Sequence, residues 1–187
     1  LIDVSVEFLR SKKNPCIIDL CSGSGCVAIS IERELKLKNP EIFGVELSKK
    51  AFEYFKINAE INRSNVKAIS GDILKIYSEF CDGRFDAIIS NPPYIRTDEI
   101  SRLQKEVKFE PKMALDGGDD GLYFYKSICK NWIPKLKVGG MIAFEIGLGQ
   151  ENEIKEFMEE SGIGCIKFYK DINDIIRVVS GIKESAL

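Results

Sequence analysis

Short apolar runs alternate with amphipathic segments along the whole chain, and few folds accommodate that order. Seven runs have the length and composition of buried strands. These runs are residues 16–20, 42–46, 66–70, 85–90, 140–146, 165–169 and 175–180. Between them, apolar residues recur at helical spacing, as at Leu122, Tyr125 and Cys129. Strands and helices that alternate in this way predict an α/β fold, in which helices cover both faces of a mostly parallel sheet.

The bulk composition fits one domain that spans residues 1–187. The apolar fraction of 44% is enough for a hydrophobic core, and the net charge of −2 counts against a nucleic-acid partner. No apolar run reaches the roughly 20 residues of a membrane span, and no signal peptide is visible. The chain opens at Leu1, already within a helix-like pattern, so we expect it to begin partway through a longer protein. We also expect a cytoplasmic monomer without a membrane partner.

The chain contains no histidine, which excludes His-based catalytic triads and His-containing metal sites. Its six cysteines form no Cys-x-x-Cys pair, so zinc coordination has no support in the sequence. The cysteines fall mostly within apolar strands and helices, which is typical of buried thiols in a reducing cytosol. We accordingly expect no metal in the site.

A glycine-containing turn follows the first predicted strand, in the segment Asp19-Leu20-Cys21-Ser22-Gly23-Ser24-Gly25. Glycine lets backbone N–H groups approach a ligand closely, because no Cβ intervenes. Glu46 ends the next strand, 21 residues after Gly25, and a carboxylate at that spacing can accept both hydroxyls of a ribose. Asp72 follows the third strand, where it can face an adenine edge while Ile73 packs against the ring. We interpret Asp19 as a residue that orients the turn.

The turn does not by itself exclude a dinucleotide. The fingerprint of dinucleotide-binding proteins has a third glycine, for which alanine is tolerated, and Ala28 stands at that position. NAD therefore stays open as a ligand at this point.

The segment Asn91-Pro92-Pro93-Tyr94 directly follows the predicted strand 85–90, and ligands of open α/β sheets bind at such strand ends. A planar amide nitrogen is a poor nucleophile, because its lone pair is delocalised into the carbonyl group. The Asn91 side-chain oxygen and the Pro92 carbonyl can accept hydrogen bonds from such an NH2 group and aim its nitrogen. The prolines limit the freedom of the loop, and the Tyr94 ring can pack on the flat group. Together with the glycine turn, this segment predicts methyl transfer to a planar amide or amine nitrogen.

These motifs resemble those of class I S-adenosylmethionine-dependent methyltransferases, and specifically those of the HemK/PrmC protein-(glutamine-N5) methyltransferases. The resemblance extends over nearly the whole chain. It implies a Rossmann-like fold with a mostly parallel seven-stranded sheet and an antiparallel last strand. It also implies that residues 1–187 are the catalytic domain, without the helical N-terminal domain that members of the family carry. Where Cys21 stands, the family often has glycine.

The resemblance also assigns roles to residues, with S-adenosylmethionine as the cofactor. The cofactor-binding set is Asp19, Cys21, Ser22, Gly23, Gly25, Glu46, Leu47, Asp72, Ile73 and Asn91. Asn91, Pro92 and Tyr94 correspond to the catalytic residues, which hold the substrate glutamine. Pro93 and the segment Phe109-Glu110-Pro111 correspond to further substrate-binding residues.

The implied reaction is methylation of a glutamine side-chain nitrogen in the Gly-Gly-Gln loop of peptide chain release factors, which are the expected protein partners. Three alternatives stay open. A sister group that acts on a ribosomal protein tends to carry histidine where Phe109 stands, so Phe109 favours the release-factor group. A nucleic-acid amino methyltransferase uses similar Asn-Pro-Pro motifs, because a flipped base can present its planar exocyclic amine to such a slot. The intact Asn91–Tyr94 segment counts against a donor-binding module without catalysis.

Overall fold

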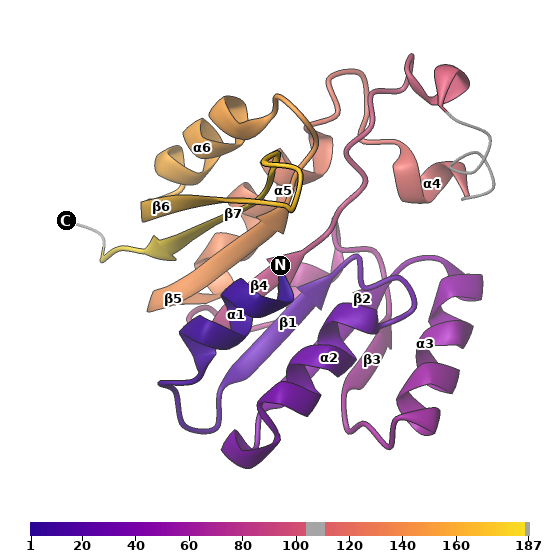
Figure 1. Ribbon diagram of the computed structural model, residues 1–187. Helices are drawn as coiled ribbons and strands as arrows, with labels where there is room; N and C mark the ends of the chain where they lie inside the picture. The colour runs from indigo at the N-terminus through magenta and orange to yellow at the C-terminus, as the bar shows by residue number, and fades with distance from the viewer. Residues whose placement is uncertain (104–110, 186–187) are drawn as a thin grey trace.

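The computed structural model describes residues 1–103 and 111–185, and its centre is a seven-stranded sheet in the order β3-β2-β1-β4-β5-β7-β6 (Figure 1). The strands are β1 (Cys16–Leu20), β2 (Glu41–Glu46), β3 (Lys67–Ser70), β4 (Phe85–Ser90), β5 (Leu136–Glu145), β6 (Ile163–Lys170) and β7 (Ile176–Lys183). Strands β1 to β5 pair with one another in parallel, whereas β7 pairs antiparallel with both β5 and β6. The predicted sheet, with its antiparallel last strand, is confirmed.

Helices cover both faces of this sheet (Figure 1). On one face lie α1 (Ile2–Leu9), α2 (Cys26–Glu34) and α3 (Lys49–Ile61), and on the other lie α5 (Tyr123–Trp132) and α6 (Glu151–Glu160). The single turn α4 (Lys112–Leu115) lies beyond the ends of the strands. Short 3₁₀ helices span Lys36–Lys38, Ile76–Glu79, Ile100–Arg102 and Ile133–Lys135. Within the described ranges, no helix has both the length and the hydrophobicity that crossing a bilayer requires.

The structure buries the helical faces that the apolar spacing predicted. On α5, Tyr125 and Trp132 are fully buried, and Trp132 Nε1 donates a hydrogen bond of 2.9 Å to the carbonyl of Ile73. Helix α3 begins after Ser48, whose Oγ accepts a hydrogen bond from the Ala51 amide at 3.3 Å. A side-chain acceptor there satisfies one of the amides that the first helical turn leaves without an internal partner. Local spacing and capping thus fix where these helices lie.

Strand β5 is longer than the sequence predicted. It begins at Leu136 and not at residue 140, and its pairing with β4 has a register shift between Phe85 and Ala87. Gly139 within this stretch has a φ of 73°, a backbone conformation that glycine adopts without steric cost. The irregularity lets the strand continue through residues that resemble a turn in the sequence.

Candidate active site

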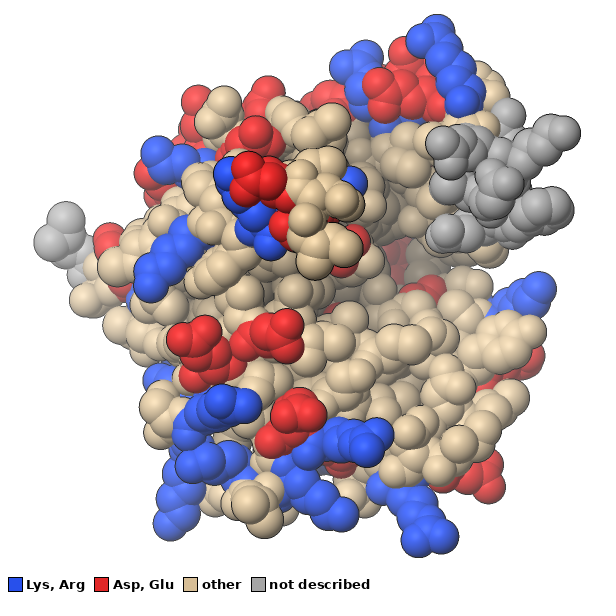
Figure 2. All heavy atoms as spheres, viewed as in Figure 1, with Lys and Arg blue, Asp and Glu red and all other residues tan. Residues whose placement is uncertain are grey.

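The carboxyl ends of β1, β2 and β4 border a cavity of about 370 Å³. Figure 2 shows this side of the molecule hollowed on the right, with acidic side chains at the bottom of the hollow. The volume is within the range of about 300–1,000 Å³ that is usual for small-molecule sites. The predicted site residues that line the cavity are Asp19, Cys21, Ser22, Gly23, Glu46, Leu47, Asp72, Ile73, Asn91, Pro93 and Pro111. These residues meet because neighbouring parallel strands end at the same edge of the sheet.

The glycine turn after β1 is held by its own backbone, by β2 and by α3. The Ser22 amide donates to the carbonyl of Val45 at 2.9 Å, and the Gly25 amide donates to the carbonyl of Ser22 at 2.8 Å. Gly25 has a φ of 81°, and a Cβ at this position would lie 2.2 Å from the ring of Phe55. Gly25 therefore lets the turn pack directly on α3. It supports the cavity from behind and is not among the described lining residues.

Cys21 also has a positive φ, of 60°, although unlike the glycines of this turn it carries a Cβ. Glycine adopts this left-handed conformation more easily than other residues, which gives a physical reason for the glycine that resembling sequences carry there. Burial, together with the charges of Glu46 and Asp19, raises the pKa of the Cys21 thiol well above its ordinary value. The thiol is therefore a neutral part of the cavity wall and not a nucleophile at neutral pH.

Glu46 joins the end of β2 to the glycine turn. Its Oε2 accepts a hydrogen bond from the Gly23 amide at 2.7 Å, and its Oε1 accepts one from the Ser48 amide at 2.6 Å. A carboxylate oxygen has two lone pairs, so each oxygen keeps acceptor capacity for a ligand in the cavity. The sequence predicted only a ligand role for Glu46, and the structure adds that this side chain fixes the shape of the turn.

Asp72 and Ile73 are fixed at the cavity wall by contacts behind them. Asp72 Oδ1 accepts a hydrogen bond from the Leu74 amide at 3.0 Å, and its Oδ2 forms an ion pair with Lys75 at 3.4 Å. The carbonyl of Ile73 accepts the hydrogen bond from the buried indole of Trp132. The position of Ile73 therefore depends on α5, which lies far along the chain, whereas Asp72 is held by residues that directly follow it.

Asp19 is the most deeply buried carboxylate of the cavity, and only 2% of its surface is exposed. Within the described residues, its Oδ2 has no hydrogen-bond partner. Burial, with a smaller contribution from the charge of Glu46, raises the pKa of Asp19 to about 7, although the Ser22 hydroxyl and the Ala28 amide oppose this shift. Buried polar atoms are rarely left unpaired, so the free oxygen suits a ligand that donates a hydrogen bond or carries positive charge.

The raised pKa of Asp19 predicts a pH dependence of stability in the absence of ligand. Between the ordinary pKa of 3.8 and about 7, the folded chain keeps a proton on Asp19 that the unfolded chain has lost. The contribution of Asp19 to stability is therefore fully present below pH 4 and is lost as the pH rises to 7, with a slope of up to about 1.4 kcal/mol per pH unit. In Asp19→Asn we expect this slope to disappear. Urea unfolding of both chains between pH 4.5 and 8 measures the difference, and an equal difference at every pH would contradict the assignment.

The Asn-Pro-Pro-Tyr segment leaves β4 with its first residue exposed and its two prolines buried. Ser90, the last residue of β4, donates from Oγ to the carbonyl of Leu20 at 2.7 Å and so ties this segment to the end of β1. Asn91 and Pro93 line the cavity beside the glycine turn. The substrate-like and cofactor-like motifs of the sequence therefore open into one space.

The remaining predicted substrate residues lie in different places. Pro92 and Tyr94 are not among the described lining residues, and Tyr94 instead packs near Gly147 at the end of β5. Pro111, at the N-cap of α4, lines the cavity. Phe109 and Glu110 lie outside the described residues.

The charge of the cavity wall discriminates between classes of ligand. Three carboxylates line it, those of Asp19, Glu46 and Asp72, and no lysine or arginine is among the lining residues that the structure describes. A wall of one sign attracts ligands of the opposite sign. A positively charged nucleoside fits this wall, whereas the two phosphate charges of a dinucleotide would face carboxylates without a balancing cation. The cavity thus disfavours NAD, which the glycine turn alone had left open.

The model of the N-6 DNA methylase family matches residues 1–166 of this chain. The chain belongs to this family.

Its relatives include proteins named release factor glutamine methyltransferase. The one from Thermodesulfovibrio yellowstonii is 42% identical over 175 residues, which cover 91% of this chain and 60% of the relative. The one from Clostridium acetobutylicum is 37% identical over 186 residues, which cover 98% of this chain and 64% of the relative.

The resemblance to the HemK/PrmC glutamine methyltransferases, stated above from the motifs, is confirmed by these relatives. The chain spans about 60% of the length of the first of them and 64% of the second.

Solved structures agree on the fold. A methyltransferase from Pyrococcus furiosus superposes with a TM-score of 0.69 at 22% identity, over 98% of this chain and 83% of that one. The hMettl16 catalytic domain, solved in complex with a MAT2A 3′UTR hairpin, gives a TM-score of 0.73 at 14% identity, over 98% of this chain and 67% of that one. The predicted class I methyltransferase fold of this family member is confirmed.

Phe124 is the most informative residue that the sequence analysis missed. It lines the cavity together with Asn91 and Pro93, and Met113 and Ala114 of α4 do so as well. Phe124 lies beside the buried face of α5 and not on it. An aromatic residue outside the apolar face of a helix was therefore the sequence signal that could have identified it as a site residue. The position of α4 had no comparable signal, because its four residues carry no recognisable pattern.

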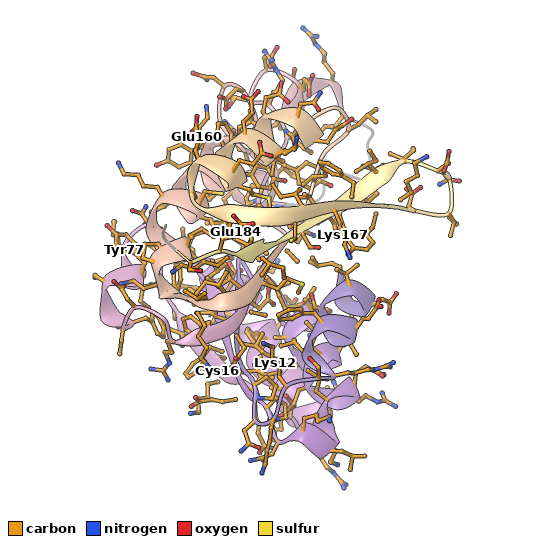
Figure 3. The ribbon with its side chains drawn as sticks, turned by 90° about the vertical axis from the view of Figure 1, so that its left-hand side faces the viewer. Lys12, Cys16, Tyr77, Glu160, Lys167 and Glu184 are labelled. Carbon is orange, nitrogen blue, oxygen red and sulfur yellow. The ribbon has the colours of Figure 1, made fainter. Side chains whose placement is uncertain are left out.

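A second, shallower hollow of about 1,080 Å³ lies at the other end of the sheet, where β5 begins. Figure 3 looks onto this side of the molecule and labels Glu160, one of its lining residues. Lys183 there donates hydrogen bonds to the carbonyls of Ile133 at 2.9 Å and Leu136 at 2.8 Å. None of the predicted site residues that the structure describes lines this hollow, so we do not assign the site to it despite its larger volume.

Proposed function

We propose that this chain transfers a methyl group from S-adenosylmethionine to the side-chain amide nitrogen of a glutamine in a peptide chain release factor, with residues 1–187 acting as one catalytic domain. The observation that carries the proposal is that Asn91 and Pro93 share one cavity with Glu46 and Asp72. The names of the relatives, which match 91% and 98% of this chain, support glutamine as the acceptor.

The acidic cavity suits the proposed donor. Bound S-adenosylmethionine would supply a methyl group on a positively charged sulfur, which needs no metal or covalent nucleophile to react. In the proposal, Glu46 accepts hydrogen bonds from the ribose hydroxyls, Asp72 faces the adenine edge, and Ile73 packs on the ring. The unpartnered Oδ2 of Asp19 would face positive charge on the ligand. Each of these groups is already held by backbone hydrogen bonds or by burial, so little ordering is required on binding.

The proposal gives the Asn-Pro-Pro-Tyr segment the task of orienting the acceptor. The Asn91 side-chain oxygen and the Pro92 carbonyl accept hydrogen bonds from the two N–H groups of the glutamine amide. These bonds hold the plane of the amide and direct the face of the nitrogen toward the donor. Since an amide nitrogen is a weak nucleophile, such positioning supplies much of the rate.

A nucleic-acid amine is the second candidate acceptor, because the matching family is described as N-6 DNA methylase. An exocyclic amine is planar and has two N–H groups, so the same two acceptors suit it. The ribosomal-protein glutamine of the sister group is the third candidate. Glutamine is favoured, since several relatives named for it are 34–42% identical over most of this chain.

The decisive experiment supplies isotopically labelled donor together with one candidate acceptor at a time. The acceptors are a release factor, a total ribosomal protein fraction, and adenine-containing DNA or RNA, and mass spectrometry then locates the label. We expect label on the glutamine of the Gly-Gly-Gln loop of the release factor. Label on adenine, or on no glutamine of any protein, contradicts the proposal. Calorimetric titration with S-adenosylmethionine and with NAD tests the donor separately, and we expect heat of binding only from the former.

A further inference from the structure

Gln150 connects three loops at the carboxyl end of the sheet through its side-chain amide. It lies at the N-cap position of α6, shortly after the end of β5. Its Oε1 accepts a hydrogen bond from the Gly147 amide at 2.9 Å. Its Nε2 donates to the carbonyl of Tyr94 at 3.0 Å and to that of Gly121 at 3.3 Å. One half-buried side chain thus joins the end of β5, the Asn-Pro-Pro-Tyr segment and the turn that precedes α5.

Only one orientation of this amide satisfies its surroundings. The Gly147 amide can only donate, and the two carbonyls can only accept. If the oxygen and nitrogen of Gln150 exchanged places, the oxygen would face two carbonyl oxygens and the NH2 group would face an N–H group. The site therefore requires a side chain that both accepts and donates at these positions, which glutamine provides and glutamate does not.

Glycines lie around the Tyr94 backbone, and because they have no side chain they leave room for Gln150 to contact the Tyr94 carbonyl. A Cβ on Gly121 would lie 2.6 Å from the Tyr94 oxygen, and a Cβ on Gly117 would lie 2.8 Å from the Tyr94 Cα. A Cβ on Gly147 would lie 2.7 Å from Oε1 of Gln150. At Gly117 and Gly121 such distances to backbone atoms exclude a larger residue without a shift of the backbone, whereas a larger residue at Gly147 would displace the Gln150 side chain. Three glycines thus surround the hydrogen bond by which Gln150 holds the Tyr94 carbonyl of the Asn-Pro-Pro-Tyr segment.

We infer that Gln150 is a positioning residue of the active site, which fixes the Asn91–Tyr94 segment through the Tyr94 carbonyl; this inference rests on the function proposed above. The two prolines between Asn91 and Tyr94 have restricted backbone angles, so an anchor at the Tyr94 carbonyl also limits the Pro92 carbonyl. Gln150 itself is not among the described residues that line the cavity. Its loss should therefore disturb acceptor orientation and leave the donor site intact.

The variants Gln150→Leu and Gln150→Glu test this role. Leucine removes all three hydrogen bonds, whereas glutamate keeps an acceptor for Gly147 but places an oxygen against two carbonyls. We expect kcat to fall about 10- to 100-fold in both, because small misplacements of reacting groups are costly. We expect the KM for the release factor to change less than kcat and the dissociation constant of the donor to stay within about twofold. Asn152→Ala, at an exposed position of the same helix, is the matched control and should behave as the unchanged chain.

Hydrogen–deuterium exchange tests the same inference without any turnover. The Ile95 amide bonds to the carbonyl of Leu115 and the Gly117 amide bonds to that of Ile95, so peptides covering residues 91–97 and 115–121 report on this region. In Gln150→Leu we expect faster exchange there and unchanged exchange in residues 19–25. Unchanged exchange at 91–97, or a loss of donor affinity equal to the loss in kcat, overturns the inference. If the unchanged chain labels no glutamine while exchange responds as expected, the proposed function fails and the anchoring by Gln150 stands.

Discussion

Replacing Asn91 with alanine is expected to slow methyl transfer about 100- to 1,000-fold, which is the usual cost of removing one positioned polar group from an active site. The alanine variant lacks the side-chain oxygen that would accept a hydrogen bond from the acceptor amide. This exposed side chain makes no hydrogen bond to any residue that the structure describes, so the unfolding free energy should change by less than about 0.5 kcal/mol. Single-turnover kinetics with labelled donor and release factor measure the effect, and calorimetry checks that the donor still binds.

Asn91→Asp distinguishes the acceptor role from other roles of this side chain. Aspartate keeps an oxygen acceptor but cannot donate, so it should retain more activity than alanine if Asn91 acts by accepting. Asn65→Ala is the matched control, because Asn65 is exposed and precedes β3 at the other end of the sheet. Turnover of Asn91→Ala within threefold of that control would show that the role assigned to Asn91 is wrong.

The second large effect is expected for Gly25→Ala, which should lower the unfolding free energy by roughly 2–5 kcal/mol. A left-handed backbone at a residue with a Cβ costs about 1–2 kcal/mol. Overpacking adds about 1–3 kcal/mol, because the new Cβ would lie 2.2 Å from the Phe55 ring. Such a loss is a large part of the about 5–15 kcal/mol that stabilises an ordinary domain. Urea unfolding monitored by circular dichroism provides the measurement, and donor affinity should fall as well because the turn must move.

The variant Gly23→Ala separates the cost of the left-handed backbone from the cost of overpacking. Gly23 also has a positive φ, of 56°, but apart from Gly23 and its two chain neighbours, no described residue has an atom within 4 Å of where its Cβ would stand. Its alanine variant should therefore lose only the backbone contribution, about 1–2 kcal/mol. In the double variant Gly25→Ala with Phe55→Leu, the smaller side chain should relieve part of the steric cost, which a double-mutant cycle detects. Equal losses for Gly23→Ala and Gly25→Ala would contradict the proposed contact with Phe55.

Much of the fold could be predicted because its signals are local. The buried strand Phe85–Ser90 is a continuous apolar run, as parallel strands covered on both faces usually are. The buried face of α5 follows directly from the spacing of Tyr125 and Trp132. The start of β5 was misplaced because its irregular pairing depends on Phe85, which lies about fifty residues earlier in the chain. A pattern within the strand itself could not reveal that partner.

The chemistry at the ends of the strands was determined by the sequence alone. Carboxylates lie at or just beyond the carboxyl ends of β1, β2 and β3, and an amide with two prolines follows β4, so the sequence already determined which kinds of group meet in the cavity. Only the tertiary structure decided that Glu46 holds Gly23, that Phe55 fills the space behind Gly25, and that Gln150 joins three loops. The physical reason is distance along the chain. Periodicity and turn chemistry act over a few residues, whereas these contacts form only when the sheet order brings separate strand ends together.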